Sequence, residues 1–456
     1  MWRKIPRWLA AFTVCAVYSA GSWAWAQQNA GVFVDAEGVL RKQEFNDPNG
    51  QLTRERIEAQ LAALDPDIAK PSPMRYISLN RLEKAIEGRI AQGRHPSDEM
   101  QALAGLTRVR YVFFLPETGD VVIAGPAEPW AKDLSGRTRG IKSGRPIVEL
   151  QDLIVALRAY PPGVRDRGVV VGCSIDPTSE GLARMQQFLR QVGGRATPRD
   201  TQFIVDGLQK SLGRQVVTIQ GIDPETHMAQ VLVEADYRMK LIGIGLEKPP
   251  IKLTSYVDRA SASQVSRNAM QRWFFVPDYE CLRVAEDRLA VELVGDGVKL
   301  LGEDEVVSGD GQRLVQSSTP NIASKGFVDD FTRNYGRLAD KSPVYAQLRN
   351  CIDLLVAAAF IQDNDYYGKA GWDATTLRSE EKVPVRTLNV PKNVETAVNA
   401  MWKGNRLMTP VGGGVHIEPA MALASDKLLA DEGGAVAQKR QQLNLKDLPA
   451  DQWWWD

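Results

Sequence analysis

Two carboxylates in a run of alternating charge are the strongest candidates for chemistry in this sequence. Glu234, Asp236, Arg238 and Lys240 alternate with apolar residues in the run VLVEADYRMKLIGIGLE at residues 231–247. On a strand, alternate residues project from one face, so the four charges would lie together. Carboxylates two residues apart on a strand are separated by roughly 6 to 7 Å, a spacing that acid/base hydrolysis of glycosidic bonds can use.

The same run has a simpler interpretation as a solvent-facing strand. Alternating charged and apolar residues are typical of a half-buried strand, on which neighbouring charges of opposite sign stabilise one another. The run is similar in part to the Glu-x-Asp-x-x-Glu strand of one family of glucan hydrolases, but Met239 stands at the third acidic position. This departure favours a solvated strand over a hydrolase site.

A glycine-rich loop supplies a cluster of positive charge. The run GRTRGIKSGR at residues 136–145 carries Arg137, Arg139, Lys142 and Arg145 and contains no acidic residue. Guanidinium and ammonium groups in such a loop could bind an anionic glycan or a phosphate. The alternative is a mobile loop whose charges face water.

The signals for a metal site are weaker. In the run DNDYYG at residues 363–368, Asp363, Asp365 and Gly368 match positions one, three and six of a calcium loop. Positions five and twelve are Tyr367 and Ala374, which are not calcium ligands of that motif. The three histidines are scattered and form no zinc-ligand spacing. We therefore expect no cofactor, with a weak Ca²⁺ site at Asp363 and Asp365 as the alternative.

Cys173 is a candidate nucleophile because it stands where a strand pattern ends and a helix pattern begins. A helix N-terminus lowers the pKa of a thiol and so increases the thiolate fraction. Cys173 lies in GVVVGCSIDP at residues 168–177, and a similar run, QVVTIQGIDP, recurs at residues 215–224 with Gln220 in the position of the cysteine. This replacement favours an inert, buried cysteine.

Composition excludes several classes of protein. The chain has 456 residues, of which 44% are hydrophobic, and 56 Lys and Arg balance 56 Asp and Glu. A neutral chain lacks the basic surface that non-specific nucleic-acid binding requires. The length permits two or three domains with cores of their own.

The first 26 residues have the pattern of a signal peptide. Arg3, Lys4 and Arg7 precede an uncharged, mostly apolar segment at residues 9–17, and the sequence Ala-Trp-Ala at residues 24–26 suits a signal peptidase. An uncleaved anchor is the alternative. The longest later apolar run, residues 354–361, is too short to span a membrane. We therefore predict a protein exported to the periplasm or beyond the cell, without a transmembrane span after signal removal.

The elements that must position these residues alternate between short strands and amphipathic helices, which predicts an α+β fold. Strand and hairpin units are interleaved with helices, and a C-terminal helical hairpin is followed by a small α/β piece. The predicted segments are the signal peptide at 1–26, an N-terminal α+β region at 27–135, a central α/β region with strand-turn repeats at 145–316, a linker at 317–326, the helical hairpin plus strands at 327–425, and a flexible tail at 426–456. The tail should be mobile unless its three tryptophans dock.

Four stretches resemble one family. They are VLVEADYRMKLIGIGLE at 231–247, RWFFVPDYECLRV at 272–284, ELVGDGVKLLGEDE at 292–305 and PVYAQLRNCIDLLVAAAF at 343–360. Together they resemble the uncharacterised exported proteins of planctomycete bacteria catalogued as domain of unknown function 1598. The resemblance extends over most of residues 100–420 and implies export and a shared fold. It implies no activity and no catalytic residues.

These observations favour a non-catalytic, envelope-associated protein that binds or scaffolds an unknown envelope protein or glycan. The motivation is the export signal together with the lack of a complete catalytic motif in the sequence. The alternative is a secreted carboxylate-dependent hydrolase, similar to glycoside hydrolases, that uses Glu234 and Asp236. A cleft that gathers both carboxylates would favour the alternative.

Overall fold

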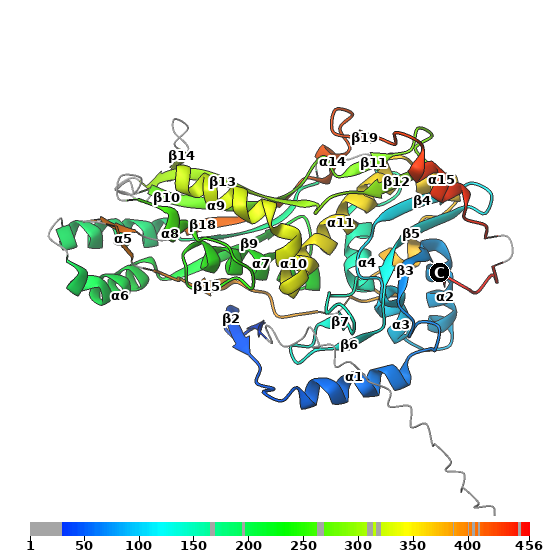
Figure 1. The fold of residues 1–456 in the computed structure, drawn as a ribbon, viewed down its shortest axis with the longest axis horizontal. Helices are drawn as coiled ribbons and strands as arrows, with labels where there is room; N and C mark the ends of the chain where they lie inside the picture. Colours follow the sequence, from blue (N-terminus) through cyan, green and yellow to red (C-terminus); the bar gives the residue numbers. More distant parts are fainter. Residues whose placement is uncertain are drawn as a thin grey trace, which may run out of the picture.

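The computed structural model describes residues 30–164, 169–193, 197–261, 269–307, 313–315, 321–385, 387–399, 401–403, 406–408, 411–445 and 448–456. The predicted signal peptide and residues 317–320 of the predicted linker lie outside the described residues. The described chain combines mixed β-sheets with helices (Figure 1), which confirms the predicted α+β class.

The larger sheet has nine strands within the described ranges. Their spatial order is β1 (Ala30–Val34), β2 (Val39–Glu44), β15 (Asn393–Glu395), β9 (Arg214–Gln220), β8 (Val171–Asp176), β18 (Val411–Ile417), β10 (Ala269–Pro277), β13 (Val298–Val307) and β14 (Arg313–Val315). β2 pairs with β15, and β10 with β18, in parallel, while the other neighbours are antiparallel. The two runs of the internal repeat are thus adjacent antiparallel strands, β8 and β9.

The second sheet has seven strands in the same ranges. Their order is β19 (Leu429–Ala430), β11 (Leu282–Val284), β12 (Ala290–Leu293), β4 (Tyr111–Leu115), β5 (Asp120–Ala127), β3 (Ser72–Ser78) and β20 (Trp454–Trp455). Two short ribbons pair β6 (Trp130–Lys132) with β7 (Thr138–Gly140) and β16 (Met401–Lys403) with β17 (Arg406–Met408). Both large sheets draw strands from the predicted N-terminal, central and C-terminal parts of the chain.

The helices fill the space between and around the sheets (Figure 1). The longer ones are α1 (Gln51–Ala63), α2 (Leu79–Ala91), α4 (Leu150–Ala159), α5 (Ser179–Val192), α6 (Thr201–Leu212), α7 (His227–Gly243), α9 (Ile322–Arg333) and α11 (Pro343–Asp363). The shorter ones are α3 (Asp98–Gln101), α8 (Tyr256–Arg259), α10 (Tyr335–Lys341), α12 (Tyr366–Ala370), α13 (Thr375–Arg378), α14 (Pro419–Ala422) and α15 (Ala435–Gln441). The side chain of Asn321 accepts hydrogen bonds from two backbone N–H groups at the start of α9, so the predicted linker is already helical from Ile322.

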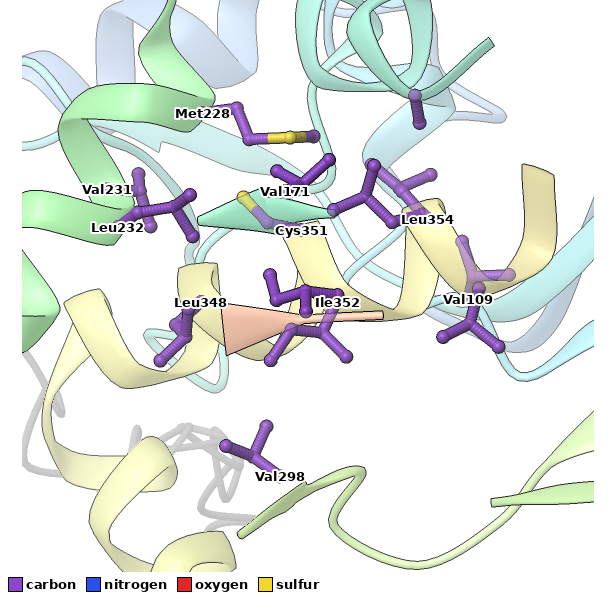
Figure 2. Packing of buried hydrophobic residues seen from close by; sticks show 14 of the residues in the cluster. Val109, Val171, Met228, Val231, Leu232, Val298, Leu348, Cys351, Ile352 and Leu354 are labelled. Carbon is purple, nitrogen blue, oxygen red and sulfur yellow. The ribbon is translucent and has the colours of Figure 1, made fainter. Parts of the chain in front are cut away.

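α11 is the central helix of the core. Every residue from Pro343 to Ile361 is buried, and the helix packs against α4, α7 and α10. Figure 2 shows this packing, in which side chains of α11 face α7, β8 and the segment before β4; the labelled residues are Val109, Val171, Met228, Val231, Leu232, Val298, Leu348, Cys351, Ile352 and Leu354. Among the described residues, α11 is the one helix long and apolar enough to cross a membrane, but it is enclosed by protein.

The predicted helical hairpin is confirmed by aromatic contacts. Phe331 and Tyr335, from α9 and α10, contact Tyr345 of α11 with ring centroids 5.6 and 6.2 Å apart. Phe275 of β10 contacts the same tyrosine at 5.9 Å, so the hairpin is fixed onto the nine-stranded sheet. These rings are each at most 1% exposed.

The predicted strand at residues 231–247 is wrong, because the charged run lies in α7. The Thr226 side chain accepts a hydrogen bond from the backbone N–H of Ala229 and begins the helix. The alternating charges pair four residues apart, Glu234 with Arg238 and Asp236 with Lys240, as helical spacing requires. α7 is buried on nearly all sides, so it carries both apolar and paired charged residues into the interior.

The C-terminal tryptophans dock, which is the condition under which the tail is not expected to be mobile. β20 pairs antiparallel with β3, and Trp455 stacks on Tyr76 with ring centroids 5.6 Å apart. The Arg75 guanidinium is completely buried, bonds to the Asp456 carboxylate at 2.7 and 2.8 Å and lies 4.7 Å from the ring centre of Trp454. Residues 454–456 are therefore fixed to the edge of the seven-stranded sheet.

Candidate functional site

A cavity of about 630 Å³ lies where α4 and α7 begin, and β1 and the β6–β7 ribbon contribute to its lining. Its lining combines apolar side chains with charged ones, and the loop before α3 together with residues 382–385, Leu388 and Asn389 completes its wall. Cavities of this size and mixed character are typical of small-molecule sites.

A histidine that lines the cavity is paired with a carboxylate behind it. His227 is the first residue of α7, and its Nδ1 lies 2.9 and 3.0 Å from the two carboxylate oxygens of Asp152 in the first turn of α4. Burial lowers the pKa of the imidazole, but the carboxylates of Asp152 and Glu149 outweigh burial and raise that pKa to about 9. The Asp152 contact also fixes the orientation of the ring, as in acid/base and metal sites.

Gln347 of α11 connects this pair to the basic loop. Its Oε1 accepts a hydrogen bond from Arg137 Nε at 2.9 Å, and its Nε2 lies 3.2 Å from His227 Nε2. Arg137 also forms a salt bridge with Glu234 of α7. A single chain of polar contacts therefore starts at Asp152, behind the cavity wall, and runs along the wall from His227 to Glu234.

Buried ion pairs extend the chain beyond Glu234. Arg238 contacts the Glu234 carboxylate at 3.4 Å and the Glu247 carboxylate at 2.7 Å, and Lys42 of β2 lies 3.3 Å from Glu247. Burial alone would lower the pKa of Arg238. The carboxylates of Glu234 and Glu247 outweigh burial and raise this pKa above its ordinary value. Because removing one member leaves an uncompensated buried charge, such a network holds its members in place.

One comparison with known proteins gives a match. Residues 173–256 match the family model described as "Protein of unknown function (DUF1598)". The resemblance to DUF1598 is confirmed over this segment. It contains the run at 231–247, while the other three stretches that suggested the family lie outside the match. No curated protein and no solved structure gives a significant match.

The DUF1598 segment supplies one side of the cavity. It extends from within β8 through α5, α6 and β9 to the start of α8, and so includes His227 and Glu234. Arg238, a partner of Glu234, lies in the same segment, whereas Asp152, Gln347 and Arg137 come from elsewhere in the chain. The cavity is therefore built jointly by the DUF1598 segment and the regions on either side of it.

The two carboxylates predicted from sequence do not converge. Glu234 lines the cavity, whereas Asp236, two residues on, points to the opposite side of the helix, because successive residues of a helix turn by about 100°. Asp236 is completely buried, and Lys240 Nζ bonds to it at 2.8 Å and to the carbonyl oxygens of Ile175 and Gly413. Burial raises the pKa of Asp236 to about 6, against the effect of Lys240. The paired-carboxylate geometry of the hydrolase hypothesis is therefore absent for these two residues.

The four cations of the glycine-rich loop point in different directions. Arg137 reaches the cavity, while Arg139 is buried against Asp133 at 3.6 Å and the carbonyl oxygen of Gly144 at 2.8 Å. Arg145 pairs with Asp340 at 2.8 Å, and Lys142 is exposed. The predicted anion site formed by all four residues is not assembled, but one of them takes part in the cavity.

The predicted calcium loop forms a helix boundary. Asp363 is the last residue of α11, and the Asp365 carboxylate accepts a hydrogen bond from the backbone N–H of Gly368 at 3.2 Å as the N-cap of α12. In the part of the chain that the structure describes, no group of three or more His, Cys, Asp or Glu is placed to hold a metal ion.

The three cysteines in the described residues, Cys173, Cys281 and Cys351, are buried thiols. Cys173 lies inside β8, opposite Ile219 and Val415, and not at the end of a strand as predicted. Burial raises the pKa of Cys173 and of Cys351 well above the ordinary value, and raises the pKa of Cys281 to about 12. These groups are therefore thiols, and not thiolates, near neutral pH.

Sequence reasoning missed His227, Asp152 and Gln347. Their contacts join residues 75 and 120 positions apart, and no motif marks them. The one available signal was Thr226 followed by His227, a typical helix start whose first residue is titratable.

Proposed function

We propose that this chain is a non-catalytic binding protein whose cavity takes a small molecule. The observation that carries the proposal is the cavity of about 630 Å³, whose lining combines fixed polar and charged side chains with apolar ones in similar proportion. Binding sites of this kind are concave, mostly apolar and contain a few fixed polar groups. The network from Asp152 to Lys42 fixes those groups before a ligand arrives, which lowers the entropic cost of binding.

A neutral fluorescent probe, N-phenyl-1-naphthylamine, tests the proposal without regard to ligand charge. We expect saturable enhancement of its fluorescence by the wild-type chain. Gln230→Trp, which places a large ring at the cavity wall on α7, should weaken binding by about tenfold or more by filling the space. Leu246→Trp is the matched control, because Leu246 is exposed just beyond α7 and away from the cavity.

Two results would contradict ligand binding. One is the absence of saturable enhancement, and the other is equal probe affinity in the wild-type and Gln230→Trp chains. Either result would leave a scaffold role, in which the outer surface contacts another envelope protein, as the better hypothesis.

We also propose that the protein is exported, as its N-terminal sequence predicts. The basic residues, the apolar segment and Ala-Trp-Ala at residues 24–26 support this proposal. Expression of the full chain in a Gram-negative host, followed by fractionation and N-terminal sequencing, should give a periplasmic product that begins at Gln27. A cytoplasmic product that retains residue 1 would contradict it.

A further inference from the structure

His227 Nδ1 has the Asp152 carboxylate as its acceptor, but among the described residues His227 Nε2 faces the Gln347 amide and no carboxylate or carbonyl oxygen. Gln347 has one acceptor atom, Oε1, which receives the hydrogen of Arg137 Nε, a group that stays protonated. The Gln347 amide therefore presents its NH₂ group to His227 Nε2. When His227 is protonated, two donors face each other across 3.2 Å at the cavity wall. A ligand atom that accepts from both would remove this conflict.

Charge favours an anionic acceptor. The groups that face His227 are Asp152 and Glu149 from α4, Gln347 from α11 and Arg137 from the basic loop. The two carboxylates hold the proton on the imidazole, so Nε2–H is a charged donor, and charged donors bind carboxylates more strongly than neutral carbonyl groups.

Two helix N-termini reinforce this preference. α4 has 10 residues and α7 has 17, and the first residues of both, Leu150 and His227, line the cavity. The N-terminus of a helix carries a partial positive charge and stabilises a nearby anion.

The remaining lining limits the ligand to a single negative charge with an apolar body. Among the described residues, the charged side chains of the lining, His227 and His95 apart, are Lys132, Arg137, Lys382, Asp98, Glu149 and Glu234. Cations and acids are equal in number, so a doubly charged anion would meet uncompensated repulsion. Trp130, Ile154 and Val231 supply apolar surface in the same cavity.

We infer that the cavity binds a small amphiphilic monocarboxylate, whose carboxylate accepts hydrogen bonds from His227 Nε2 and the Gln347 amide. This inference rests on the proposed binding function and names the ligand class of that site. The carboxylate lies across the N-termini of α4 and α7, and the apolar chain of the ligand extends along Ile154 and Val231.

Calorimetric titration with sodium octanoate and with octanamide tests the inference, because the two probes have nearly the same size and differ in charge. At pH 7 we expect octanoate to bind the wild-type chain at least about tenfold more tightly. Gln347→Leu and His227→Gln should remove this preference. Arg145→Gln should keep it, because Arg145 belongs to the same loop but pairs with Asp340 away from the cavity.

A pH series on the wild-type chain tests the inference without any variant, so the misfolding of a variant does not affect the result. Octanoate affinity should fall as pH rises through 9, whereas octanamide affinity should stay constant. Equal affinities for the two probes at pH 7 would overturn the carboxylate inference. The proposed binding function would still stand if the naphthylamine probe binds saturably. If neither probe binds, the inference is overturned, and the naphthylamine titration decides separately whether the cavity binds any ligand.

Discussion

Removal of His227 should change how the stability of the protein depends on pH. The imidazole pKa is raised from 6.5 to about 9 in the folded chain. A group whose pKa is raised by folding contributes stability that is complete below pH 6.5 and is lost as pH rises through 9. Each pKa unit corresponds to about 1.4 kcal/mol, so the contribution is about 3 kcal/mol. This figure is an upper limit, because the Gln347 NH₂ group opposes the imidazolium.

Histidine-selective NMR offers a direct assay, because the chain has three histidines. The resonance missing from His227→Gln identifies His227, and its chemical shift in the wild-type chain should titrate near pH 9. Urea unfolding at pH 6 and pH 10 should show that the stability difference between the wild type and His227→Gln shrinks at the higher pH. His416→Gln is the control and should leave the His227 titration unchanged, because His416 lies on β18 and does not line the cavity.

The reasoning would be refuted by either of two results. A His227 resonance that titrates at or below pH 6.5 would show that burial outweighs Asp152 and Glu149. A stability difference that is the same at pH 6 and pH 10 would show that the proton on His227 makes no contribution to folding.

Three further predictions concern the core, the tail and the thiols. Phe331→Ala should lower the free energy of unfolding by about 3 to 5 kcal/mol in urea titrations, because the ring is completely buried among other rings; a loss below 1 kcal/mol would contradict the packing. Arg75→Gln should release the docked tryptophans, detected as faster proteolysis of residues 448–456, and unchanged protection would show that strand pairing alone holds them. The three buried cysteines should resist iodoacetamide in the folded chain and react in urea, as mapped by peptide mass spectrometry; rapid labelling without urea would contradict their burial.

Local elements were largely predictable from sequence because short-range chemistry determines them. Pro116-Glu117-Thr118-Gly119 forms the turn between β4 and β5 as expected, and Ser78 caps α2 through a hydrogen bond from the backbone N–H of Arg81. In each case the turn or cap residue acts on backbone groups within a few positions, so the signal lies in one stretch of sequence.

The alternation of charged and apolar residues at 231–247 predicts a strand, although the spacing of the charges by four is that of a helix. The same four charged residues satisfy both patterns, and the i,i+4 pairs of opposite sign indicated the helix. The run is buried, and a buried helix needs a partner for every charge it carries, which the pairs four residues apart provide. The cavity was even less accessible to sequence reasoning, since its wall joins Asp152, His227 and Gln347 from three separate helices.

The pairing of β2 with β15 has a consequence for how the protein reaches its native state. Arg41 on β2 bonds to Glu395 on β15, 354 positions further along the chain, and β15 in turn separates β2 from β9. Sheets closed by such distant partners fold slowly, because loop-closure entropy opposes them until late contacts form. We expect refolding on a timescale of seconds or longer and no independently folding fragment when the chain is cut in the 317–326 region. A slowly closing sheet would also give an export machinery time to translocate the unfolded chain.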